Sequence, residues 1–318
     1  MKPENPVPCK STTLAYQHRS ATRSDLPSYQ DLPNTPKLFL STKSDRRKHY
    51  HKQHTIPKIS ASNYSVFDQF QQKFLFSHNA SQPREIASLT KIMTCHLVLT
   101  LIDRYSESVS INSMVEVSEK AAKTSGTSAK LKTGDVLSVK SLLYGLMLPS
   151  GNDASVVLAE FFGNILNSGC LKPEKRFVLE MNRLALEIGM PTTHFSNPHG
   201  LMHCKNLSSS RDICKLACVA LRNSCFREIV GSYSYVSEII GKDGFLRFSN
   251  WINTNKLLGK GFNGVKTGVT LSAGPCLCVS YNKDVQVVVV LLNCKSMDDR
   301  WVDAKKLVDW VLSKSYFR

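Results

Sequence analysis

The sequence predicts a mixed α/β (α+β) fold, in which both ends of the chain contribute strands to one antiparallel sheet flanked by helices. Three observations predict it: a hairpin pattern near residue 60, helical periodicity through the middle of the chain, and three strand-like runs before a final helix. The two hairpin strands and three C-terminal strands give a sheet of about five strands, with a helical insertion at about residues 92–255.

The N-terminal hairpin is predicted at residues 59–78. ISASNYSVFD and KFLFSH have the composition of strands, and DQFQQ between them is a candidate turn. After Pro83, the apolar residues of SLTKIMTCHLVLTLIDRY recur with a helical period. A helix is therefore expected to begin at Ser88.

The middle of the chain, about Ser138 to Arg227, is predicted to be mostly helical. SVKSLLYGLM and NDASVVLAEFFGNIL are two helices separated by the break LPSG, and KPEKRFVLEMNRLALEIG and SSSRDICKLACVALRN are two more. GFNGVKTG, GPCLCVSYN and VQVVVVLLN then give three strands separated by turns. DDRWVDAKKLVDWVLSK closes the sequence as an amphipathic helix.

Composition excludes two classes of protein. Hydrophobic residues make up 42% of the 318 residues and charged residues 21%, so global disorder is excluded. The longest apolar run, Val285–Leu292, is far shorter than the ~20 residues of a membrane-spanning helix. MKPENPVPCKSTT has no apolar core of a signal peptide, so an intracellular protein is expected, exported only if the N-terminus is incomplete. The sequence does not determine the oligomeric state.

Residues 1–58 are predicted to be a basic, Ser/Thr/Pro-rich, disordered extension. They hold 11 Lys/Arg against 4 Asp/Glu, a large share of the net charge of +16. Such a tract is typical of a tether to nucleic acid or acidic membrane, or of a solvated tail. It lacks the interleaved aromatic residues of a base-stacking surface, so we favour the tail and expect neither nucleic acid nor membrane as a partner.

The ten cysteines include no CxxC pair, and without a signal peptide they are expected to be reduced. Cys214, Cys218 and Cys225 fall on one face of a predicted helix. Three thiolates can contribute to a metal site, but cysteine packs at least as often as a small core residue. We therefore predict neither a metal site nor a cofactor.

Three short motifs follow one another along the chain: SLTK at 88–91, SGN at 150–152 and KTG at 266–268. Ser88 opens a helix, so Lys91 lies one turn further on the same side. A lysine serves as a base for serine if burial and a second cation lower its pKa, and Lys266 is a candidate for that cation. Singly, the motifs also fit a helix cap, a turn and a strand edge; their order and placement favour one site.

From about Ile59 to its end, the chain resembles the serine D-alanyl-D-alanine carboxypeptidases, the low-molecular-weight penicillin-binding proteins. The resemblance extends beyond the trio to IASLTKIMT, GTSAKLKTGD, LMLPSGNDASVVLAE, FVLEMNRLALEIGM, THFSNPHGL, NTNKLL and GVKTGVTLSAG. It implies that residues 59–318 form a catalytic domain with a β-lactamase/transpeptidase-like fold.

The resemblance also implies roles for single residues. Ser88 is the implied nucleophile that forms an acyl-enzyme, Lys91 its general base, and Ser150 a proton relay to the leaving amine. His199, in NPHGL, is interpreted as a structural turn residue rather than a catalytic one.

The implied substrate-binding residues come from the second and third motifs. Asn152 is expected to bind the substrate amide, Lys266 to supply positive potential, and Thr267 to bind the terminal carboxylate. Gly268 leaves room for a substrate along the strand edge, and Val269 supplies a backbone N–H to the oxyanion hole together with Ser88.

The implied activity is removal of the C-terminal D-Ala from peptides that end in D-Ala-D-Ala, with β-lactams as covalent inhibitors. Two alternatives remain at this stage: a non-catalytic penicillin-binding-like module that recognises cell-wall fragments, and an esterase or amidase that uses the same serine.

Overall fold

The computed structural model describes residues 56–166, 169–203 and 205–314. The predicted N-terminal extension falls outside these residues except for its last three positions, so its disorder stays a prediction.

The predicted antiparallel sheet is confirmed, and it has five strands in the order β2-β1-β11-β10-β9. Each neighbouring pair is antiparallel. The central pairing joins β1 to β11, with Val66 opposite Val289, so the two ends of the chain meet in the middle of the sheet. The strands are β1 (Asn63–Asp68), β2 (Lys73–His78), β9 (Phe262–Thr270), β10 (Gly274–Asn282) and β11 (Gln286–Leu292).

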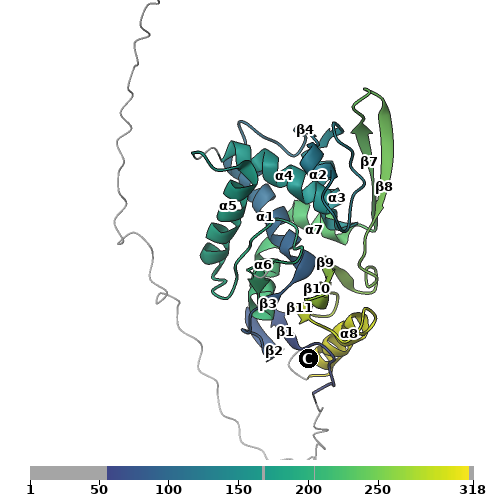
Figure 1. The fold of residues 1–318 in the computed structure, drawn as a ribbon. Helices are drawn as coiled ribbons and strands as arrows, with labels where there is room; N and C mark the ends of the chain where they lie inside the picture. The colour runs from purple at the N-terminus through teal and green to yellow at the C-terminus, as the bar shows by residue number, and fades with distance from the viewer. Residues whose placement is uncertain (1–55, 167–168, 204, 315–318) are drawn as a thin grey trace, which may run out of the picture. The chain divides into compact units, whose positions relative to one another are not determined.

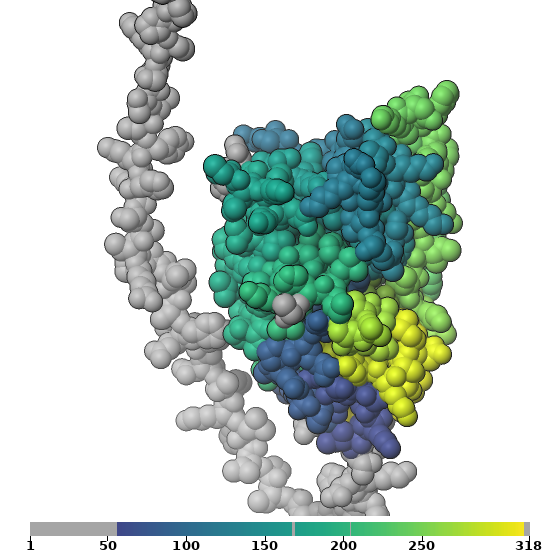
Figure 2. Space-filling view, viewed as in Figure 1, coloured from purple at the N-terminus to yellow at the C-terminus, as the bar shows by residue number. Residues whose placement is uncertain are grey.

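The sheet is covered on both faces, which explains why β11 is apolar along its whole length. Val287, Val289 and Leu291 pack with the C-terminal helix α8 (Asp299–Leu312) on one face. The alternate residues of β11 point into the larger core formed by the helical region. Figure 2 shows the yellow C-terminal helix beside the purple and blue N-terminal hairpin, and Trp310 of α8 packs against Phe76 of β2.

The predicted helices of the middle region are present and pack around α1 (Figure 1). The helix α5 begins at Pro173 and ends before Gly189, whose φ of 76° gives the left-handed cap that glycine tolerates best. The region comprises α1 (Thr90–Arg104), α2 (Glu119–Ala122), α3 (Val139–Met147), α4 (Asn152–Ile165), α5 (Pro173–Ile188), α6 (Ser210–Ala220) and α7 (Ser224–Gly231).

Cys214, Cys218 and Cys225 do not share one helix, contrary to the prediction. Asn223 caps a new helix by accepting a hydrogen bond from the Phe226 N–H, so Cys225 lies on α7 while the other two lie on α6. The eight cysteines among the described residues are free thiols.

The inserted region also contains strands that periodicity did not predict. A second sheet has the order β4-β5-β7-β8, and β6 (Leu207–Ser208) pairs with β3 (Arg84–Glu85), which precedes the inserted region. β4 (Met114–Glu116) and β5 (Val136–Ser138) are too short to show a period. β7 (Ser234–Ile240) and β8 (Leu246–Ile252) carry apolar residues on both faces, so the polar alternation of a half-exposed strand is missing.

Within the described residues, no helix combines the length and the apolar composition needed to cross a membrane.

Candidate active site

Ser88 lies in a single 3-10 turn, Ala87–Leu89, which leads directly into α1. The turn begins at Ala87, whose φ of 48° is a conformation that costs a non-glycine residue energy. The KTG strand lies against it: a Cβ added at Gly268 would sit 3.1 Å from the backbone N of Ser88. The Ser88 N–H is thus placed beside β9, where the oxyanion hole is predicted.

Lys91 is fully buried and its ammonium has three oxygen acceptors. Its Nζ lies 2.9 Å from Ser88 Oγ, 2.7 Å from Asn152 Oδ1 and 2.7 Å from the His199 carbonyl. Burial, and then the charge of Lys266, lower the pKa of Lys91 well below that of an exposed lysine, although Asp153 opposes the shift. A neutral Lys91 presents a lone pair to the Ser88 hydroxyl, as a general base requires.

Ser150 and Asn152 lie in the loop between α3 and α4, and the 125–127 segment fixes both. Thr127 donates to the Ser150 carbonyl from its hydroxyl, and its own carbonyl accepts from the Asn152 N–H. Asn152 Nδ2 donates to the Ser125 carbonyl at 2.7 Å. Asn152 Oδ1 retains one lone pair beyond the Lys91 contact, which suits the predicted contact with a substrate amide.

The hydroxyl of Ser150 is buried and has no hydrogen-bond partner among the described residues. The residue also has a left-handed φ of 65°. Buried polar atoms are normally paired, so an unpaired hydroxyl in a strained turn points to a function rather than to stability.

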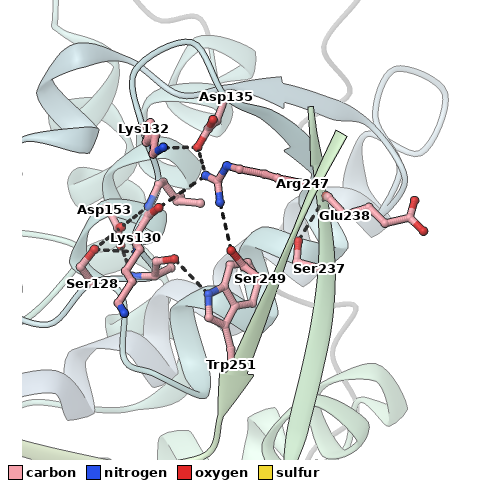
Figure 3. Close-up of polar contacts among 12 residues, drawn as sticks. Ser128, Lys130, Lys132, Asp135, Asp153, Ser237, Glu238, Arg247, Ser249 and Trp251 are labelled. Atoms are coloured by element: carbon pink, nitrogen blue, oxygen red, sulfur yellow. Dashed lines mark hydrogen bonds and ion pairs between the residues drawn. The ribbon is translucent and has the colours of Figure 1, made fainter. Parts of the chain in front are cut away.

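The loop that carries residues 125–135 is held in place by buried polar contacts (Figure 3). The Asp153 carboxylate accepts hydrogen bonds from the backbone N–H groups of Ala129 and Leu131 and from the Ser128 hydroxyl. Trp251 of β8 donates its indole N–H to the Ala129 carbonyl at 3.0 Å. The start of α4 and the second sheet therefore both position the loop that contacts Ser150 and Asn152.

Lys266 and Thr267 extend from β9 on the other side of the site. Lys266 is buried, and burial followed by the nearby charge of Arg300 lowers its pKa to about 7. Its Nζ donates to the Thr267 carbonyl at 3.0 Å. The Thr267 and Thr254 hydroxyls lie 2.8 Å apart, which orients the Thr267 side chain.

β9 is the edge strand of the five-stranded sheet, so one side of its backbone is available to an extended peptide. Gly268 is too close to the Ser88 turn to carry a side chain without displacement, so packing within the protein itself favours glycine here. The room that Gly268 leaves for a substrate stays a prediction. Val269 follows it and is 49% exposed.

Arg300 completes the cationic side of the site and was missed by sequence reasoning. It comes from α8, is 6% exposed, and its guanidinium lies 3.5 Å from the Gly268 carbonyl. In the sequence it is one charge within an amphipathic helix 32 residues beyond Gly268. Only the packing of α8 against the sheet brings it to β9.

The loop of NPHGL, around His199, supports Lys91 through its backbone. The Pro198 carbonyl accepts from Thr94 and Ser155, each at 2.6 Å, and the next carbonyl, of His199, accepts from Lys91. Burial, and then the charge of Lys91, lower the pKa of His199 to about 3, so its imidazole is neutral. This geometry agrees with the structural role predicted for His199.

The site thus joins a serine to a buried lysine beside a cationic strand edge, the arrangement of a serine acyl-transfer enzyme. A family model described as D-alanyl-D-alanine carboxypeptidase, Peptidase S11, matches residues 50–296. The chain therefore belongs to this family of serine peptidases.

Relatives of known sequence and structure agree with this assignment. The chain is 32% identical to the D-alanyl-D-alanine carboxypeptidase of Streptomyces strain K15 over 80% of its length and 88% of that protein. It is also 32% identical to DacF of Bacillus subtilis over 76% of its length, but spans only 59% of DacF. The crystal structure of the Streptomyces K15 DD-transpeptidase superposes with a TM-score of 0.75 and 31% identity, covering 82% of this chain and all of that one.

Proposed function

We propose that the chain is a serine-type D-Ala-D-Ala carboxypeptidase that acts through an acyl-enzyme on Ser88. The observation that carries the proposal is the 2.9 Å contact between Ser88 Oγ and the buried Nζ of Lys91. A serine hydroxyl is a weak nucleophile until a base removes its proton, and the lowered pKa of Lys91 supplies that base.

In acylation, Lys91 takes the Ser88 proton as Oγ attacks the carbonyl of the penultimate D-Ala. The ester bond forms, the peptide C–N bond breaks, and the leaving D-Ala amine receives a proton through the unpaired hydroxyl of Ser150. The backbone N–H groups of Ser88 and Val269 stabilise the oxyanion. Water then adds to the ester carbonyl, and the Ser88–acyl bond breaks to release the shortened peptide and restore the Ser88 hydroxyl.

The cationic strand edge suits a substrate that ends in a free carboxylate. An extended peptide along β9 places its last residue near Thr267, with Lys266 next to it on the same strand and Arg300 at the Gly268 carbonyl. Lys266 and Arg300 are buried and have no carboxylate partner among the described residues, which favours a bound anion. Asn152 Oδ1 accepts the N–H of the scissile dipeptide, which fixes the carbonyl over Ser88.

The test combines intact-protein mass spectrometry with a product assay. Wild-type protein incubated with benzylpenicillin is expected to gain the mass of one penicillin, and to release D-Ala from an acylated tripeptide ending in D-Ala-D-Ala. Ser88→Ala is expected to lose both. Ser280→Ala is the matched control, because Ser280 is another buried serine and begins a second SxxK sequence, whose lysine lies beyond the end of β10.

Three outcomes contradict the proposal. A folded wild-type protein that neither forms an adduct nor releases D-Ala favours the binding-module alternative. Full D-Ala release by Ser88→Ala excludes Ser88 as nucleophile. Faster cleavage of esters or L-terminated peptides than of D-Ala-D-Ala peptides supports the esterase or amidase alternative.

A further inference from the structure

The outer face of the β7–β8 hairpin is apolar and uncovered. Side chains alternate across the strands, so Ser237, Ile239 and Trp251 point toward the protein and the alternate residues point away. In Figures 1 and 2 no other element of the described chain lies over this outer side. We call the following residues, each between 40% and 76% exposed, the hairpin face: Val236, Ile240, Phe245, Leu246, Phe248 and Ile252.

The residues of the hairpin face are contiguous. Ile240 pairs directly with Leu246, and Phe245 lies in the turn beside them. The other apolar residues face a polar partner, Val236 opposite Asn250, Phe248 opposite Glu238 and Ile252 opposite Ser234, so they neighbour one another diagonally across the two strands. Six such side chains that are about half exposed present an apolar area on the order of 500 Å². Patches of this size on a folded protein mark contact surfaces, whereas single exposed apolar residues do not.

Positive charge borders both ends of the hairpin face. At the turn, a surface pocket of about 430 Å³ beside Phe245 and Leu246 is lined by three cationic and two acidic residues, a small positive excess: Lys132, Lys242, Arg247, Asp135 and Asp243. At the other end, Lys256 and Lys260 are exposed on the loop that follows β8. Gly259 of that loop lies against the Tyr233 hydroxyl, which places the loop beside the start of β7.

We propose that the hairpin face docks on an anionic lipid bilayer. Its apolar side chains enter the boundary between headgroups and acyl chains, and the lysines at both ends meet lipid phosphates. The flexible lysine stems allow the amines to stay at the headgroup level while the apolar residues penetrate. This proposal is independent of the proposed catalytic function, and it concerns surface binding rather than a membrane span.

A second copy of the chain fits the hairpin face less well. Glu238 points away from the protein on this face, opposite Phe248 and midway between Val236 and Ile240 (Figure 3). A symmetric dimer that packs face to face about this point brings two carboxylates together in an apolar contact, which is costly. Binding to a bilayer instead requires that the Glu238 carboxylate stay at the hydrated level of the headgroups.

The test is co-sedimentation of the full chain with sucrose-loaded vesicles. Binding to vesicles of phosphatidylcholine with 30% phosphatidylglycerol is compared with binding to vesicles of pure phosphatidylcholine. The rate of acylation by penicillin is measured on the same samples. The double variant Phe245→Ser/Phe248→Ser removes the two aromatic residues, and Lys132→Gln/Lys242→Gln removes the charge at the turn. Phe70→Ser is the matched control, because Phe70 is 86% exposed on the distant β1–β2 turn.

Wild type and Phe70→Ser are expected to bind the anionic vesicles equally. The aromatic double variant is expected to bind the anionic vesicles at least tenfold more weakly than wild type. The lysine double variant is expected to bind about tenfold more weakly than wild type, and only to the anionic vesicles. All four proteins are expected to keep their acylation rates, which reports intact folding. Phe248→Trp is expected to show tryptophan emission shifted to the blue on binding, relative to wild type.

Three results overturn the proposal. The first is no binding of wild type to anionic vesicles at 50 mM NaCl. The second is equal binding by wild type and the aromatic double variant, which assigns any lipid affinity to another part of the chain. The third is a wild-type dimer in analytical ultracentrifugation that becomes monomeric in the aromatic double variant, which assigns the hairpin face to a second copy.

Discussion

The protonation of Lys266 predicts how activity depends on pH. Its pKa of about 7 lies far below the 10.5 of an exposed lysine, because the side chain is buried and Arg300 is nearby. If positive charge at Lys266 is needed to hold the substrate carboxylate, kcat/KM falls as pH rises through about 7. Lys266→Arg replaces the amine with a group that stays charged throughout the accessible range, so the fall disappears.

The size of the effect follows from the fraction of protein that is charged at Lys266. With a pKa of about 7, roughly 1% of Lys266 is protonated at pH 9, so kcat/KM is expected to drop about 100-fold from its plateau. The assay measures D-Ala release at subsaturating peptide from pH 5 to 10, because kcat/KM reports the free enzyme. Each profile is normalised to its own maximum, since Lys266→Arg also enlarges a buried side chain.

Arg300→Gln provides an independent arm of the same experiment. Removing the Arg300 charge removes a cause of the low pKa of Lys266, so the alkaline fall is expected to move to higher pH. Lys306→Arg, on the exposed side of α8, serves as the control and is expected to leave the profile unchanged. An alkaline fall that keeps its position in both Lys266→Arg and Arg300→Gln refutes the assignment to Lys266.

Three further substitutions test the geometry of the site, and a fourth, Gly244→Ala, is the control for the first. Gly200→Ala places a Cβ against the Ala87 carbonyl oxygen, at a backbone φ of 87° that alanine rarely adopts. We therefore expect the free energy of unfolding, measured with urea, to fall by more than about 2 kcal/mol, and acylation to be slower. Gly244 has a similar φ but open space around it, so Gly244→Ala is expected to lower the free energy of unfolding by only about 1 kcal/mol. If both variants lose the same free energy of unfolding, the predicted steric clash at Gly200 is contradicted. Ser150→Ala removes a hydroxyl that has no hydrogen-bond partner among the described residues, so the free energy of unfolding should change by less than about 0.5 kcal/mol. Turnover is expected to fall about 100-fold or more, and unchanged turnover excludes the proton relay. Asp153→Asn places an amide NH₂ where a carboxylate oxygen accepts from backbone N–H groups, so we expect the free energy of unfolding, measured with urea, to fall by about 1–3 kcal/mol. An unchanged free energy of unfolding shows that the carboxylate does not hold the 125–135 loop.

The sheet was predictable because its strands carry a strong local signal. β11 is a run of buried valines, and the β1–β2 hairpin has apolar strands around a polar turn. That both ends of the chain contribute to one sheet followed from the order of elements along the chain, whereas the pairing of β1 with β11 was not predicted. The second sheet was not predictable, because β4 and β5 have three residues each and the apolar outer face of β7–β8 removes the alternation on which strand prediction depends.

The site was predictable where its residues form short sequence motifs. Ser88 and Lys91 share a helical turn, and Lys266 and Thr267 share a strand, so local spacing brings each pair together. Arg300 carries no such signal, because its position depends on the docking of a helix against a sheet. The support of Lys91 by the His199 backbone carbonyl is also invisible in sequence, since any residue provides a carbonyl.

The three buried basic residues of the site act on one another in a way that suits a carboxypeptidase. Arg300 lowers the pKa of Lys266, and Lys266 in turn lowers the pKa of Lys91. A substrate carboxylate bound near Thr267 counters the first effect, so Lys266 regains its proton when substrate is in place. The restored charge at Lys266 then keeps Lys91 neutral and ready to accept the Ser88 proton. A peptide with its scissile bond far from a free C-terminus provides no such carboxylate, so the same electrostatics that activate Ser88 also favour cleavage at the last residue.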